Sequence, residues 1–225
     1  MLFYTKILAD TKGDYMKTLI VIPALNPPLD LIQYIEKLRQ SGLEDILIVD
    51  DGSRSECGYI FEQLRDKQGC QILTHAKNLG KGRALKNAFN YFLTMPNVEE
   101  YNGIVTADSD GQHRVEDVLS MVETISNYPD SLILGCRDFD SENVPPKSKF
   151  GNKLTKLVFK LLYGRKITDT QTGLRGFPKA ILHEMLEISG ERFEYETKMF
   201  IHTFDNSIPI KEIRIETIYF DGNAE

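Results

Sequence analysis

Short apolar runs alternate along the chain with segments in which apolar residues recur at helical spacing. The short runs, rich in β-branched residues, lie at 18–22, 46–49, 71–74, 104–107, 131–135 and 211–219. Helical spacing marks residues 28–40, 59–66, 81–94, 115–126, 150–162, 179–188 and 194–204. This alternation predicts an α/β fold with a mostly parallel central sheet flanked by helices.

The chain has 225 residues, which suits one large domain. We expect residues 1–16 to be a flexible leader and residues 17–225 to be a single domain. Residues 169–176 carry turn-forming side chains and are predicted to be a loop. No apolar run approaches the roughly 18–20 residues that a membrane-spanning helix needs.

Composition narrows the functional classes. The net charge of −6 gives no reason to expect nucleic-acid binding, which needs a concentrated basic surface. The three cysteines lie far apart and include no Cys-x-x-Cys pair, so neither a zinc knuckle nor a disulfide framework is indicated.

Polar clusters follow the first, second and fourth predicted strands. The carboxyl ends of parallel strands line the ligand crevice of an open α/β sheet, so these clusters are expected to meet there. The strongest is Asp108-x-Asp110 behind a buried run, with Gln112 two residues on. Two nearby carboxylates favour a bound cation, and such oxygen ligands suit Mg²⁺ or Mn²⁺. An acidic turn that caps the next helix is the alternative interpretation.

The two other clusters are weaker when each is taken alone. Asp51 can bind ribose hydroxyls or a base edge, or it can instead cap a helix. The Gly-rich run around Lys81 lets backbone N–H groups approach a phosphate, although it lacks Walker A spacing. An ordinary turn explains that run as well.

Taken together, these motifs resemble family 2 glycosyltransferases, in particular the dolichol- or polyprenyl-phosphate sugar transferases. The likeness runs from about residue 18 to the C-terminus. It rests on VIPALN at 21–26, VDDGS at 49–53, NLGKG at 78–82, DSDGQH at 108–113, GCR at 135–137 and DTQTGLR at 169–175.

The resemblance implies a GT-A (Rossmann-like) fold, a nucleotide-diphosphate sugar donor such as a UDP- or GDP-sugar, and an inverting hexosyl transfer that depends on a metal. The nucleotide sugar would be bound by Pro23, Leu25, Val49, Asp51, Lys81, Asp108 and Ser109. Asp108, Asp110 and Gln112 would hold the metal, and the catalytic set would be Asp108, Asp110, Arg137 and Asp169. Arg137, Lys149 and Arg175 would face acceptor or donor phosphate.

The chain departs from the family pattern in three places. Pro27 stands where a Glu is usual, and Lys147 and Lys149 stand where an Arg is common. The chain also stops at Glu225, soon after the last predicted strand. We therefore expect a membrane-embedded partner or a C-terminal extension to complete the active protein.

The acceptor is expected to be a polyprenyl phosphate at the cytoplasmic face of a membrane, where the protein would bind peripherally. Lysines recur on one face of the predicted helix 150–162, opposite an apolar face, which suits an anionic membrane surface; a solvated surface helix is the alternative. A sugar-hydroxyl acceptor in cell-envelope polysaccharide synthesis would instead need a general base. Asp169, Glu194 and Glu196 are the candidates. A catalytically silent nucleotide-binding domain is a further alternative.

Overall fold

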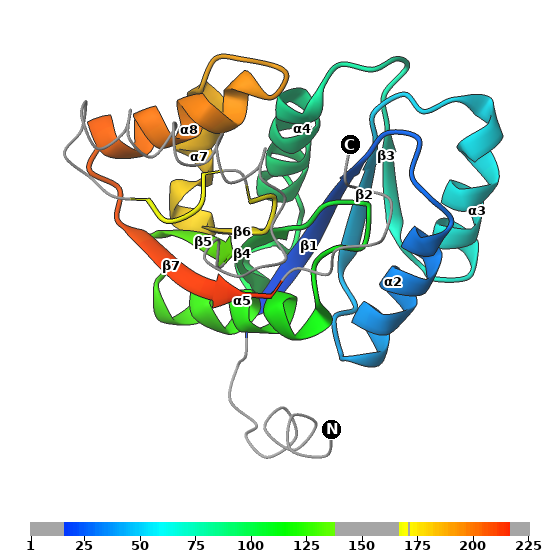
Figure 1. The fold of residues 1–225 in the computed structure, drawn as a ribbon, viewed down its shortest axis with the longest axis horizontal. Coiled ribbons are helices and arrows are strands. Elements are labelled where there is room, and N and C mark those ends of the chain that lie inside the picture. Colours follow the sequence, from blue (N-terminus) through cyan, green and yellow to red (C-terminus); the bar gives the residue numbers. More distant parts are fainter. Residues whose placement is uncertain (1–15, 138–166, 171, 217–225) are drawn as a thin grey trace.

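A seven-stranded sheet forms the centre of the molecule (Figure 1). The computed structural model describes residues 16–137, 167–170 and 172–216. The strands are β1 (Lys17–Ala24), β2 (Ile46–Asp50), β3 (Gln71–Thr74), β4 (Tyr101–Thr106), β5 (Leu132–Arg137), β6 (Arg175–Pro178) and β7 (Ile210–Ile215). The helices are α2 (Asp30–Gln40), α3 (Gly58–Asp66), α4 (Lys81–Leu93), α5 (Val115–Asn127), α7 (Leu182–Glu187) and α8 (Glu194–Asp205). Short 3-10 turns η1 (Ser55–Cys57), η2 (Val98–Glu100) and η3 (Lys179–Ile181) complete the described elements.

The sheet is mostly parallel, as predicted, in the order β3-β2-β1-β4-β6-β5-β7. Strand β6 differs, because it pairs antiparallel with both β4 and β5. The sequence analysis assigned residues 169–176 to a loop, and this is wrong for Arg175 and Gly176, which begin β6. With an Arg, a Gly and a Pro among its four residues, β6 has no local strand preference and depends on its two neighbours for pairing.

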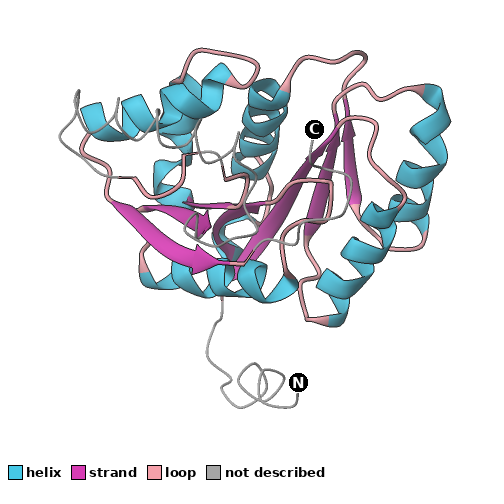
Figure 2. Cartoon of the chain, viewed as in Figure 1, coloured by secondary structure: helices cyan, strands magenta, loops and turns pink. Residues whose placement is uncertain are grey.

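Side chains alternate between the two faces of the sheet, and each face has its own core. In β1, Leu19 and Val21 pack with α4, α7 and α8, whereas Ile20 and Ile22 pack with α2, α3 and α5. This period-2 pattern is what a strand buried on both sides requires. Figure 2 shows helices on both sides of the strands, so the predicted flanking helices are confirmed.

Strand β1 continues through Pro23, where the sequence analysis ended it. Ala24 accepts a backbone bond on the β2 side, from Asp51, and Val21 accepts one on the β4 side, from Ala107. Because successive residues of a strand direct their N–H groups to alternate sides, an N–H at position 23 would point towards β4. The hydrogen-bond ladder with β4 has already ended there. A proline at such a position removes no sheet hydrogen bond.

Two predicted segments lie wholly or mostly outside the described residues: the leader (residues 1–15 of 1–16) and the basic helix at 150–162. Of the predicted strand 211–219, residues 211–215 lie in β7. No helix within the described ranges has the length and apolar character needed to cross a membrane.

The strand order places a crevice beyond the carboxyl ends of the central strands. Strand β1 lies between β2 and β4. The connection that leaves β1 leads to β2 on one side of β1, and the connection that leaves β3 leads to β4 on the other side of β1. Ligands of open α/β sheets bind at such a point, beyond the carboxyl ends of the strands.

Candidate functional site

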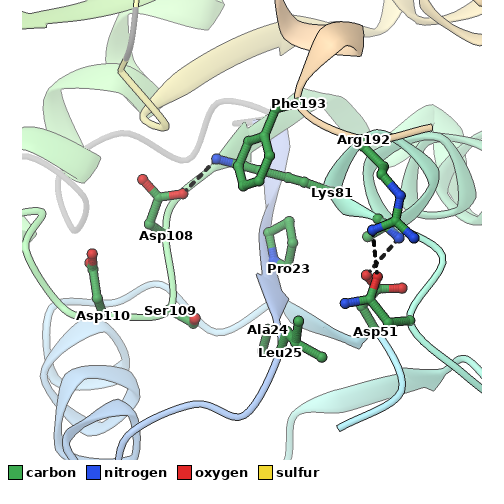
Figure 3. A pocket seen from close by; sticks show the side chains of 13 residues that line it. Pro23, Ala24, Leu25, Asp51, Lys81, Asp108, Ser109, Asp110, Arg192 and Phe193 are labelled. Carbon is green, nitrogen blue, oxygen red and sulfur yellow. Dashed lines mark hydrogen bonds and ion pairs between the residues drawn. The ribbon is translucent and has the colours of Figure 1, made fainter. Parts of the chain in front are cut away.

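A pocket of about 300 Å³ opens beyond the carboxyl ends of these strands (Figure 3). It collects residues that are far apart in the sequence, from the ends of β1, β2 and β4, the start of α4, and the turn before α8. The lining residues are Pro23, Ala24, Leu25, Asp51, Asn78, Gly80, Lys81, Ala84, Asp108, Ser109, Asp110, Arg192 and Phe193.

Asp108, just beyond the end of β4, lies between two basic side chains. Its Oδ1 accepts a hydrogen bond from Lys81 Nζ at 2.8 Å, and its Oδ2 lies 3.3 Å from His113 Nε2. Burial alone would raise the pKa of Asp108, but Lys81 and His113 outweigh it and hold that pKa well below its ordinary value. Asp108 is therefore a carboxylate at neutral pH.

Lys81 joins Asp108 to a second ion pair. Its Nζ lies 3.4 Å from Glu196 Oε1, which in turn lies 3.3 Å from Arg175 Nη2. Burial lowers the pKa of Lys81, but Asp108 and Glu196 more than compensate, so its pKa lies above the ordinary value. Lys81 therefore keeps its positive charge inside the pocket.

The carboxylates of Asp108 and Asp110 are the kind of oxygen ligand that a divalent cation bound mainly to a substrate would take. Asp110 is exposed, and its Oδ1 accepts the backbone N–H of Gln112 at 3.0 Å. This is an acidic turn, but it does not cap α5, whose N-cap residue is Arg114 and which has no side-chain cap hydrogen bond. No group of three or more His, Cys, Asp or Glu side chains forms a metal site in the described part of the chain. Two carboxylates suffice for Mg²⁺ when waters and substrate phosphates supply the other ligands.

Asp51 supports the pocket wall. Its Oδ1 accepts the N–H of Leu79 and its Oδ2 that of Gly80, each at 2.8 Å. His75 Nδ1 lies 2.7 Å from the same Oδ1, and Asn87 Nδ2 lies 2.9 Å from His75 Nε2. Asp51 is only 4% exposed. It fixes the Gly-rich segment and still contributes to the lining.

Replacing His75 by Ala is expected to lower the free energy of unfolding by about 1–3 kcal/mol, because Asp51 and Asn87 would lose a buried partner. The matched control is His202→Ala. That histidine faces Glu184 in a partly exposed pair, which should contribute only about 0–1 kcal/mol. Urea unfolding of both variants measures the difference between the two losses of stability. Equal losses would show that the buried network stabilises the fold no more than the partly exposed pair does.

The structure brings together most, but not all, of the predicted site residues. Arg137 and Asp169 form a bidentate pair, with Nε to Oδ2 at 2.7 Å and Nη2 to Oδ1 at 3.1 Å, apart from the pocket lining. Arg175 is 2% exposed, so its guanidinium faces the protein interior. Val49 is fully buried in the sheet core, and Lys149 lies outside the described residues.

Two lining residues, Arg192 and Phe193, were not anticipated from the sequence. They precede α8 and belong to no motif that carries the resemblance. Phe193 is 74% exposed, an unusual position for a large apolar ring. An aromatic residue beside an arginine at the start of a predicted helix is too common a pattern to have identified them.

Comparison with known proteins agrees with this geometry. The family model "Glycosyl transferase family 2" matches residues 19–186. A UDP-N-acetylglucosamine–dolichyl-phosphate N-acetylglucosaminyltransferase of Methanococcus voltae is 29% identical over 89% of this chain and 85% of its own length. A polyprenol monophosphomannose synthase of Mycolicibacterium smegmatis is 22% identical over 88% of this chain and 76% of its own length.

Solved structures show the same fold. Mannosyl-3-phosphoglycerate synthase from Rubrobacter xylanophilus superposes with a TM-score of 0.65 at 14% identity, covering 92% of this chain and 68% of that one. GalNAc-T7, solved with UDP, GalNAc and Mn²⁺, gives a TM-score of 0.57 at 14% identity over 92% of this chain and 45% of that one. The GT-A fold predicted from the sequence is confirmed.

Proposed function

Because the chain belongs to glycosyltransferase family 2, we propose that it moves one sugar from a nucleotide-diphosphate sugar to a polyprenyl phosphate. The transfer would invert the anomeric carbon and take place at the cytoplasmic face of a membrane. Relatives whose names specify dolichyl, polyprenol or undecaprenyl phosphate support this acceptor class.

The observation that carries the proposal is the joint placement of Asp51, Lys81 and Asp108 in one pocket. A site for a nucleoside diphosphate needs one end that binds the nucleoside and another end that binds the charged diphosphate. Pro23, Leu25 and Asp51 would serve the first end, and Lys81 with Ser109 the second.

In this proposal Asp108 and Asp110 would hold Mg²⁺ or Mn²⁺, with the Gln112 side chain as a predicted third ligand. The cation, when bound, would neutralise the diphosphate that leaves as the glycosidic bond breaks. Lys81 adds a fixed positive charge beside the same oxygens. Preorganised charge at a departing group is usually the largest catalytic contribution.

Each of the three candidate general bases already has a polar partner, and this favours an anionic acceptor. Asp169 is fully buried and bound by Arg137, and Glu196 is paired with Lys81. Glu194 Oε1 accepts two backbone N–H groups at the start of α8. A sugar hydroxyl needs a free general base, whereas a phosphate monoester is already charged at neutral pH.

Nucleotide binding is the first test. Thermal unfolding would be followed with UDP and GDP, each with and without Mn²⁺. A nucleotide at about 100 times its Kd should stabilise the fold by roughly 2.7 kcal/mol. We expect a shift for one nucleotide that is larger with Mn²⁺, and no shift with either would contradict the donor site.

The acceptor is tested with the radiolabelled donor that binds. We expect label to appear on undecaprenyl or dolichyl phosphate and to be absent when the unphosphorylated polyprenol replaces it. Transfer to a sugar hydroxyl instead would establish the alternative acceptor class. Binding without transfer to any acceptor, in the full-length protein, would indicate a catalytically silent domain.

A further inference from the structure

We propose that Arg192 and Phe193 form a fixed wall against the donor's nucleoside, with Phe193 stacking on the nucleobase and Arg192 fixing its position. This inference rests on the proposed nucleotide donor and adds two specificity-determining residues to it. Both lie in the turn before α8, at the rim of the pocket (Figure 3).

The two walls of the pocket have complementary chemistry for a flat aromatic ligand. Pro23, Ala24 and Leu25 present an apolar surface at the end of β1, and Leu25 is 43% exposed. In Figure 3, Phe193 and Arg192 lie across the pocket from this segment. A nucleobase offers apolar faces on both sides, so it fits between an aliphatic surface and an aromatic ring.

Arg192 stands at the nucleoside end of the pocket. Its Nη1 lies 3.4 Å from Asn78 Oδ1, a long contact, so within the described part of the chain the rest of the guanidinium is available for a ligand. Asn78 adjoins the segment that Asp51 fixes through Leu79 and Gly80. A planar guanidinium can stack on a base or donate to its carbonyl oxygens, which an ammonium does less well.

The turn is anchored to α4, which makes it a preformed wall. The N–H of Arg83 donates to the carbonyl of Glu191 at 2.8 Å. The Glu191 carboxylate accepts from Lys86 Nζ at 2.8 Å and pairs with Arg83. Glu194 Oε1 accepts the N–H groups of Glu191 and Arg192.

Two glycines allow this close contact. A Cβ on Gly80 would lie 2.5 Å from the carbonyl oxygen of Glu191, and one on Gly82 would lie 2.5 Å from Cβ of Tyr195. The NLGKG run thus serves to bring the turn against α4. Because the turn is already held, binding a nucleotide need not first order it.

The experiment measures affinity by calorimetry for whichever of UDP and GDP the wild type binds, and for Mg²⁺-pyrophosphate as a probe without a base. Phe193→Ala should weaken nucleotide binding roughly 5- to 150-fold, the range for loss of one base-stacking ring, and leave pyrophosphate binding unchanged. Phe193→Tyr should restore the affinity. Arg192→Ala should weaken the nucleotide about 10-fold, with only partial recovery in Arg192→Lys.

Tyr59→Ala is the matched control, because Tyr59 is an exposed aromatic residue on α3 away from the pocket lining, and its loss should not change nucleotide affinity. If the wild type binds a nucleotide and Phe193→Ala binds it equally well, this inference fails while the donor site stands. An equal loss for pyrophosphate would also overturn it. So would weaker binding of Phe193→Ala to anionic vesicles with unchanged nucleotide affinity, which would assign the ring to a membrane contact. Absence of nucleotide binding in the wild type would instead remove the proposed function itself.

Discussion

Replacing Asp108 by Asn is expected to lower kcat for sugar transfer by about 10²–10³-fold, the usual cost of losing one preorganised charged group at a reacting centre. Asn has almost the same shape and keeps one oxygen. It removes the negative charge that faces Lys81 and His113 and that would hold the cation on the leaving diphosphate.

The fold should tolerate this substitution. The Asp108 side chain is 34% exposed, so solvent can hydrate an amide there. Initial rates over a range of donor and metal concentrations measure the loss. Asp66→Asn, the same chemical change at an exposed residue of α3, should leave kcat unchanged. A kcat for Asp108→Asn within a few-fold of the wild type would show that this carboxylate does not act in the reaction.

Gly173→Ala is expected to reduce activity by about 10²-fold without removing any reacting group, since a displacement of about 1 Å can cost that much. A Cβ at Gly173 would overlap the carboxylate of Asp108. Gly173 cannot easily retreat, because its carbonyl accepts the buried hydroxyl of Thr106 at 2.9 Å. The Asp108 side chain must therefore leave the position in which it binds Lys81.

Gly58→Ala provides the matched control. Apart from its chain neighbours and its own helix backbone, no described atom lies within 4 Å of a Cβ added at Gly58. Its φ of −52° suits alanine, so stability should rise by about 0.4–1 kcal/mol. Activity and thermal unfolding would be measured for both variants. Full activity in Gly173→Ala would mean that Asp108 can shift without consequence, and that its observed position is not the working one.

Much of the fold follows from the spacing of apolar residues alone. Strands β1 and β2 are nearly continuous runs of buried apolar residues, and the ends of β2 and β4 predicted where Asp51 and Asp108 would meet. Strand β6 could not be predicted in this way, because its pairing comes from β4 and β5 and its own residues favour a turn. Local pattern fails where a strand is defined by its neighbours.

The residues of the candidate site also fall into those that the sequence predicted and those that it did not. Pocket residues that lie within the motifs that carry the family resemblance, such as Asp108 and Lys81, were identified from the sequence. Arg192 and Phe193 were not, since contacts of their turn with α4 and with Asn78 before it, over a separation of about a hundred residues, carry them to the pocket. The structural use of Asp51 was also hidden, because sequence cannot tell a carboxylate that binds a ligand from one that binds backbone N–H groups.

The reversed direction of β6 makes the two ends of that strand unequal in their tolerance of insertions. A reversed strand starts at the edge where its parallel neighbours finish, so the residues leading into it, Gly173 among them, lie against Asp108. The residues that follow Pro178 emerge at the opposite edge, among η3 and α7. Extra residues directly before β6 would displace the side chain of Asp108, whereas extra residues directly after Pro178, in η3, would enter on the far side of the sheet from it. Insertions should therefore be tolerated at the start of η3 and not in the residues directly before this strand.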